Sequence, residues 1–150
     1  MHLLDILAIL ATGLMVGNEL AVSLFVNPAL WQLDATAQVR AISLLARSLG
    51  RAMPFWYAFC LILLIAETVL RHNQPVFLPL LAATSLWAAV IVFTIVVLVP
   101  INNRVASLPT SVPLADWLPA HKGWDKLHRL RILLLILAML LLINSLLATR

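Results

Sequence analysis

The chain consists of long apolar stretches separated by short polar segments, and four of these stretches are long enough to cross a membrane. They cover residues 6–26, 52–70, 76–101 and 130–148. The hydrocarbon core of a bilayer requires about 20 residues of helix. Prolines lie near the edges of the stretches, where the missing amide hydrogen does least damage: Pro28, Pro54, Pro75, Pro79 and Pro100. The pattern therefore predicts four transmembrane helices.

The segment between the first two stretches also has helical spacing, over residues 35–51. Asp34 is the expected N-cap, and apolar residues follow it three or four positions apart. Arginines 40, 47 and 51 recur on the opposite face. This pattern is typical of a short amphipathic helix in the membrane interface, with its arginines toward lipid phosphates. An ordinary basic juxtamembrane loop would give the same topology.

The basic residues predict the orientation of the chain. Four spans put both termini on one side of the membrane. The opposite side, formed by segments 27–53 and 102–129 and the start of the fourth stretch, carries eight of the ten Lys and Arg residues. Short basic loops remain in the cytoplasm. We therefore expect a multi-pass protein of the plasma membrane, with cytoplasmic basic loops and both termini outside.

Composition narrows the class of protein further. The chain is 63% hydrophobic and 11% charged, whereas soluble domains are about 45–50% apolar and about 25% charged. This excludes a water-soluble enzyme, a disordered tail and a secreted disulfide scaffold, and nothing supports nucleic-acid binding. A length of 150 residues indicates one domain. We expect an all-α, integral membrane four-helix bundle over residues 1–150, in contact with the lipid bilayer.

Small residues form a ridge along the first stretch. Gly13, Gly17 and Ala21 are spaced four apart. Such ridges let helices approach closely, either within one bundle or between two chains. A homodimer through Gly13 and Gly17 is therefore one expectation, and close packing inside the bundle is the other.

Glu19 is the clearest anomaly in the apolar pattern, because an ionisable side chain at membrane depth costs about 2.5–3.5 kcal/mol or more. Ser23 and Asn27 follow at i+4 and i+8, so the three residues form a polar stripe toward the basic surface. Asn18 points about 100° away around the helix. Intramembrane charges of this kind are often functional.

The residues that open the fourth stretch are the expected partners of Glu19. His128 and Arg131 are three apart and share a helix face. In a functional interpretation, Glu19 and His128 converge on a substrate as candidate general bases, and Arg131 or Arg104 supplies positive charge. In a structural interpretation, Glu19 and Arg131 form a buried ion pair that ties the first span to the fourth. The residues alone leave both open.

A metal site would use Glu19 and His128 as ligands, completed by water or Asn103. These two side chains fall short of the three protein ligands typical of catalytic zinc or of non-haem iron. His121 would add a second nitrogen, but its loop is rich in Pro and Lys, which favours an exposed side chain. Glu67 lies near the other end of the bundle, where a hydrogen bond between helices or snorkelling to water is expected.

Short motifs connect the chain to a known family. Pro100-Ile101-Asn102-Asn103-Arg104 closes the third stretch, and Trp124-Asp125-Lys126-Leu127-His128-Arg129-Leu130-Arg131 leads into the fourth. Gly17-Asn18-Glu19 and Asn27-Pro28 stand in the first. In these motifs, their order and its four spans, the chain resembles the anthrone oxygenase family over nearly its whole length.

The resemblance implies an oxygen-dependent oxidoreductase that acts on a hydrophobic aromatic, anthrone-like or phenol-like small molecule, with molecular oxygen as co-substrate. Fungal members oxidise the activated methylene of an anthrone to the ketone of an anthraquinone. His128 or Glu19 would remove the methylene proton, and Asn103 and Arg131 would stabilise the resulting carbanion. The substrate-binding residues would be Asn18, Asn102 and Trp124, with Ser23 from the polar stripe. The resemblance does not decide whether a metal takes part.

The competing class is a non-catalytic membrane bundle that binds lipid or quinone, or supports a larger membrane complex. The Glu19–Arg131 pair would then be structural, and replacing both residues by apolar ones would leave a working protein. An enzyme would instead lose turnover with Glu19→Gln or His128→Ala while remaining folded.

Overall fold

The computed structural model describes the backbone of residues 2–106 and 114–148 and the side chains of residues 3–104 and 123–148. Within this part of the chain every regular element is helical. The elements are α1 (His2–Ala21), the π-helical segment η1 (Val22–Val26), α2 (Asn27–Leu30), α3 (Ala35–Leu70), α4 (Phe77–Phe93), the π-helical segment η2 (Thr94–Leu98), α5 (Val99–Ala106) and α6 (Leu114–Leu147).

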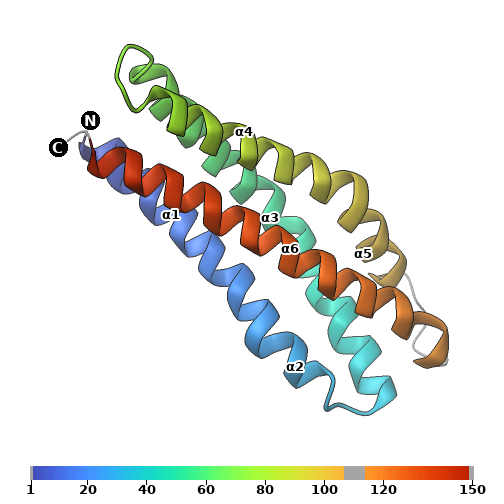
Figure 1. Cartoon of the computed structure of the whole chain (residues 1–150). Coiled ribbons are helices and arrows are strands. Elements are labelled where there is room, and N and C mark those ends of the chain that lie inside the picture. Colours follow the sequence, from blue (N-terminus) through green and yellow to red (C-terminus); the bar gives the residue numbers. More distant parts are fainter. Residues whose placement is uncertain (1, 107–113, 149–150) are drawn as a thin grey trace.

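These elements form four rods that lie side by side, with the two termini at the same end (Figure 1). Elements α1, η1 and α2 make the first rod, and α4, η2 and α5 make the third. The described residues contain four segments long and apolar enough to span a membrane: Leu3–Leu30, Ala35–Leu70, Phe77–Arg104 and Gly123–Leu147. The prediction of an all-α membrane bundle with four spans is confirmed.

The amphipathic segment after the first span is helical, but it is not a separate helix. It forms the first half of α3, which is 36 residues long in total and continues past Pro54 without a break. Asp34 caps the helix as expected, because its side chain accepts a hydrogen bond from the Ala37 amide at 3.0 Å. A backbone entering lipid must satisfy its polar groups internally, which favours an unbroken helix over a turn at the membrane surface.

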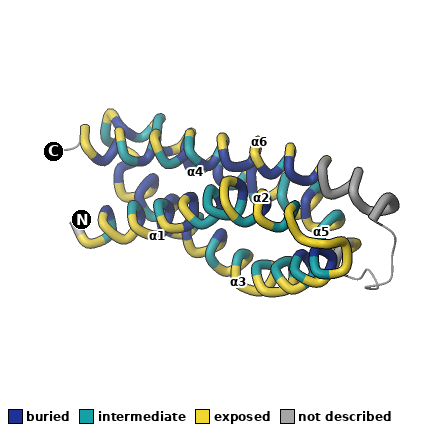
Figure 2. The backbone as a smooth tube through the Cα atoms, turned by 90° about the horizontal axis from the view of Figure 1, so that it is seen from below, coloured by how far each residue is buried: buried dark blue, intermediate teal, exposed yellow. Residues whose placement is uncertain are grey.

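The core lies where the four rods meet, and further large apolar side chains are exposed on the surface that faces away from it. Figure 2 shows this division, with buried positions facing the bundle interior and exposed positions facing away. Trp87 is fully buried in α4, packed among residues of all four rods such as Met15, Leu64 and Leu135. Trp87 is therefore a core residue.

The two glycines of the small-residue ridge on α1 have no close neighbour at the Cβ position among the described residues. A Cβ atom added at Gly13 or at Gly17 would meet nothing within 4 Å. The space beside both glycines is open, so packing inside the bundle does not explain them. The homodimer through these residues stays a prediction.

A cluster of buried charges lies at the end of the bundle that holds the two termini, and it corrects the interpretation of Glu67. The Glu67 side chain is fully buried, so it does not snorkel to water. It pairs with Arg71 one turn later, and Arg71 Nη2 also lies 2.7 Å from Asp5 Oδ1. A buried charge is tolerated only when it is paired. The three charges therefore hold the start of α1 against the end of α3.

Candidate active site

Glu19 lies at the centre of a buried polar cluster formed by three helices. Its side chain on α1 accepts a hydrogen bond from the Tyr57 hydroxyl of α3 at 3.0 Å. The other carboxylate oxygen accepts one from Arg131 Nη2 of α6 at 2.5 Å. Glu19 is 3% exposed. The ion pair between the first and fourth spans, one of the two sequence interpretations, is therefore present.

His128 belongs to the same cluster through Arg131. Arg131 Nη2 lies 2.9 Å from His128 Nδ1, and Glu19 Oε2 lies 3.4 Å from the same nitrogen. A guanidinium can only donate hydrogen bonds, so Nδ1 accepts and the neutral ring carries its hydrogen on Nε2. Among the described residues, the buried Nε2 has no hydrogen-bond partner.

Tyr57 completes the cluster and was not singled out by the sequence analysis. Its backbone carbonyl accepts a hydrogen bond from Trp87 Nε1 at 3.2 Å, and the Arg131 guanidinium lies over its ring at 5.7 Å. These contacts hold the phenol in place beside Glu19. The available signal was modest: Tyr57 is the chain's only tyrosine, and a buried phenol needs a polar partner.

A cavity of about 470 Å³ adjoins this cluster, within the range of roughly 300–1,000 Å³ typical of small-molecule sites. Glu19, His128 and Arg131 line it together with apolar residues such as Leu61 and Ile91. Asn18, Asn102, Asn103 and Trp124 also line it, so most of the predicted site residues surround one space. Such a cavity suits an apolar molecule with one polar edge.

Two sequence-based candidates do not line the cavity, and a third is not described. Ser23 is buried in η1 but is not among the described residues that line the cavity. Arg104, the alternative source of positive charge, is exposed at the end of α5 and does not line it either. The side chain of His121 lies outside the described residues. Asn27 has a structural role, since its side chain donates to Asp125 Oδ1 at 2.9 Å.

Both π-helical segments border the cavity. Val22 of η1 lines one side, and Thr94 and Ile95 of η2 line another. A proline follows each segment by two residues, at Pro28 and Pro100. Proline lacks the amide hydrogen for an i→i−4 bond and crowds that carbonyl, so a wider turn before it relieves the contact. Such turns occur frequently at functional sites.

Comparison with known protein families shows which family the chain belongs to. The model of the anthrone oxygenase family matches residues 40–141. The chain belongs to the anthrone oxygenase family. No curated protein and no solved structure matches it. The matched residues include Tyr57, His128 and Arg131, whereas Glu19 lies before them.

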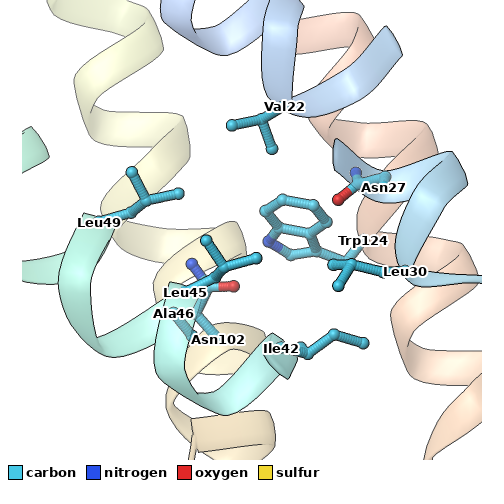
Figure 3. A pocket seen from close by; sticks show the side chains of 9 residues that line it. All are labelled: Val22, Asn27, Leu30, Ile42, Leu45, Ala46, Leu49, Asn102 and Trp124. Carbon is cyan, nitrogen blue, oxygen red and sulfur yellow. The ribbon is translucent and has the colours of Figure 1, made fainter. Parts of the chain in front are cut away.

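Trp124 forms a wall of the site in this member of the anthrone oxygenase family. Its ring stacks on the His128 ring, with centroids 4.6 Å apart and an angle of 11° between the planes. Figure 3 shows its indole extending from α6 toward Leu45 and Leu49 of α3. There it borders a second cavity of about 50 Å³, while also lining the large one. Trp124 therefore lies between the two spaces and fixes the ring plane of His128.

The geometry of this anthrone oxygenase family member does not fit a metal ion at Glu19 and His128. The described residues contain no group of three His, Cys, Asp or Glu side chains placed to hold one. In addition, one nitrogen of the Arg131 guanidinium contacts both Glu19 Oε2 and His128 Nδ1. A cation between these ligands would have to displace a positive charge, which is electrostatically unfavourable.

Proposed function

We propose that this protein is a membrane-embedded, oxygen-dependent oxidoreductase that oxidises a hydrophobic aromatic substrate of the anthrone or phenol type. The observation that carries the proposal is the cavity of about 470 Å³, which is lined by the buried cluster of Glu19, Tyr57, His128 and Arg131. Membership of the anthrone oxygenase family supplies the reaction class.

The overall reaction balances with the substrate and O₂ alone. The methylene carbon of an anthrone loses two hydrogens and gains one oxygen atom as a ketone. The second oxygen atom leaves as water with both hydrogens. The four electrons given up by the carbon reduce O₂ completely, so no further reductant is consumed. The protein's task is therefore to remove a proton and to stabilise the anion that reacts with oxygen.

Glu19 is the better candidate for the base. Arg131 donates to Nδ1 of His128, and the hydrogen of the neutral ring then occupies Nε2, so neither ring nitrogen is free to accept a proton. The Glu19 carboxylate lines the cavity and pairs with Arg131. It would take one methylene proton, and the Arg131 charge would stabilise the enolate that forms.

The remaining lining residues would bind the ring system. Trp124 offers a flat apolar surface, and the Asn102 and Asn103 amides offer hydrogen bonds to oxygen substituents at the basic end. The apolar walls suit both a fused-ring substrate and dissolved O₂. We propose, in addition, that the protein lies in the plasma membrane with this end of the bundle on the cytoplasmic side, because the basic residues cluster there.

Oxygen consumption tests the proposal directly. Purified protein in mild detergent is mixed with anthrone, and uptake is corrected for spontaneous oxidation. We expect catalysed uptake with the wild type and a loss of at least about 100-fold with Glu19→Gln, the lower range for removal of a general base. Glu67→Gln is the matched control, because it changes the other buried glutamate at the opposite end of the bundle.

The result also separates the enzyme from a non-catalytic bundle. Glu67→Gln should retain wild-type uptake, and both variants should show wild-type helix content and elution. A wild-type protein that gives no uptake above the spontaneous rate would contradict the proposed function. It would favour a bundle that binds lipid or quinone.

A further inference from the structure

The cavity opens to the outside along one side of the bundle. Most of its lining residues are buried or half-buried. Its exposed lining residues lie on α3 or on the η2–α5 segment: Gly50, Pro54, Ala58, Ile95, Val99 and Asn103. The mouth of the cavity therefore lies between these two rods.

The packing of the third rod explains why a gap exists there. Helix α3 packs against α4 and α5, which lie before and after η2, whereas η2 packs against α6. The cavity reaches this gap, since Thr94 and Ile95 of η2 line it together with Ala58 of α3. The wide turn of η2 therefore lies at the level where α3 and the third rod are separated by the cavity.

The opening lies within an apolar span, away from the end of its helix. Ala58 lies 12 residues before the end of α3 at Leu70, or about 18 Å along the helix axis. The side chains on either side of it are apolar and face outward: Phe55 is 79% exposed and Phe59 is 48% exposed. Across the gap, Val96 of η2 is 65% exposed. Apolar surfaces of this kind face lipid rather than water.

We propose that the substrate enters this cavity sideways from the bilayer, through a lateral opening formed by Pro54, Ala58, Ile95 and Val99. The inference rests on the proposed function and specifies its substrate class: an uncharged, planar aromatic molecule dissolved in the membrane. Such a molecule would pass the apolar mouth with its rings in lipid and present its polar edge to Glu19 and Arg131. A charged or glycosylated aromatic would have to leave water and cross an apolar mouth, which is costly.

Binding of anthraquinone, which has no methylene group left to oxidise, tests this route without requiring turnover. The protein is reconstituted in phosphatidylcholine vesicles and mixed rapidly with vesicles that contain anthraquinone. Occupation of the cavity is measured as the part of the tryptophan quenching that Trp124→Phe removes. We expect Ala58→Phe to slow this phase about tenfold or more by narrowing the mouth, as restricted access lowers association rates.

Two further variants make the result specific. Ala89→Phe places the same side chain at an exposed alanine of α4 that does not line the cavity, and it should keep the wild-type rate. Val99→Phe narrows the mouth from the opposite rod and should also slow binding, which preserves the test if Ala58→Phe does not fold. Wild-type rates in both folded narrowing variants would overturn the lateral route.

The outcomes for the route and for the proposed function are independent. If the wild type oxidises anthrone but Ala58→Phe and Val99→Phe bind anthraquinone at the normal rate, the function stands and the lateral opening is wrong. If the wild type binds anthraquinone through the opening but never oxidises anthrone, the route stands and the proposed reaction is wrong. A wild type that shows no Trp124-dependent quenching contradicts the route and its substrate class.

Discussion

Glu19 and Arg131 lie 112 residues apart in the chain, and their charged groups meet at 2.5 Å between α1 and α6. The same guanidinium nitrogen also contacts the imidazole of His128. A buried pair of this kind is weak evidence for stability, because removing both charges from water costs about as much as their attraction returns. Its position on the wall of the cavity, in contact with a histidine and a tyrosine, favours a role in chemistry.

The pair can be tested by comparing single and double substitutions. Arg131→Met leaves Glu19 as an unpaired buried charge and should lower the free energy of unfolding by about 3–5 kcal/mol. The double variant Glu19→Leu/Arg131→Met removes both charges, so its stability should return close to wild type while oxygen uptake stays absent. Thermal unfolding followed by circular dichroism, together with oxygen uptake, measures both effects.

Arg129→Met serves as the control for loss of an arginine from the same helix. Arg129 pairs with Asp125 at 2.8 Å, but its side chain is 63% exposed, and such pairs contribute about 0–1 kcal/mol. Its stability should change little. If the double variant at positions 19 and 131 oxidises substrate at the wild-type rate, the ion pair is structural and the proposed chemistry is wrong.

Tyr57 should act on Glu19 as a positioning residue. Tyr57→Phe keeps the ring against Trp87 and Arg131 but removes the hydrogen bond to the carboxylate. Hydrogen bonds to charged groups contribute about 1.5–3 kcal/mol. We expect kcat to fall by about tenfold to 100-fold while KM changes less, because each 1.4 kcal/mol in the barrier is a factor of ten.

A purely structural tyrosine would give a different pattern. Tyr57→Phe would then lower the unfolding temperature and leave kcat of the folded fraction unchanged. Kinetics on protein that elutes as a single species, with unfolding measured in the same preparation, distinguish the two roles. Leu61→Met is a suitable control, because Leu61 also lines the cavity from α3 and the substitution keeps the approximate volume of the side chain.

The number of spans and most of the site were predictable because their signals are local. A charge inside an apolar stretch identifies Glu19, and the three-residue spacing of His128 and Arg131 places them on one face. Tyr57 was missed because a tyrosine in an apolar stretch looks like ordinary core. Its importance depends on α3 bringing its hydroxyl to Glu19, which is a tertiary contact.

Two other differences arise from backbone geometry. The predicted stripe places Glu19 and Ser23 on one face, which assumes the rotation of about 100° per residue of an α-helix. Ser23 lies in the π-helical segment η1, where the rotation per residue is different. The segment 35–51 was separated from the second span because its polarity changes, yet a change of polarity does not require a break in the backbone. The ion pair of Asp5 and Arg71 was not predictable for a different reason, because it depends on the packing of α1 against α3.

Catalysis by the isolated protein should not depend on a metal at Glu19 and His128. Arg131 occupies the position between the two ligands, so we expect purified wild type to hold no stoichiometric metal and to keep its oxygen uptake in EDTA. His128→Ala should lose uptake without any change in metal content, because Arg131 loses the ring that helps to orient it. His72→Ala, which changes an exposed histidine at the opposite end, should behave like wild type.

Elemental analysis and an absorption spectrum of both variants and the wild type show whether a metal or chromophore is bound. A metal or chromophore present in equal amount to the protein, and lost specifically in His128→Ala, would contradict this prediction. It would mean that Arg131 moves aside when the site is loaded.

The orientation of the bundle can be tested with single cysteines. Cys60 is fully buried and the chain's only cysteine, so it contributes little background labelling. Arg47→Cys places a thiol in the basic first half of α3, and Asn73→Cys places one in the exposed turn at the opposite end. Because short basic loops stay inside, an impermeant maleimide added to intact cells should label Asn73→Cys and spare Arg47→Cys.

The same experiment locates the chemistry relative to the membrane. Along α3, Tyr57 of the polar cluster lies closer to Arg47 than to Asn73, so protection of the cysteine at position 47 would place Glu19 toward the cytoplasmic side. Labelling after the cells are permeabilised controls for thiols that are simply inaccessible. If Arg47→Cys is labelled in intact cells and Asn73→Cys only after permeabilisation, the orientation is reversed and the proton from the substrate is released outside.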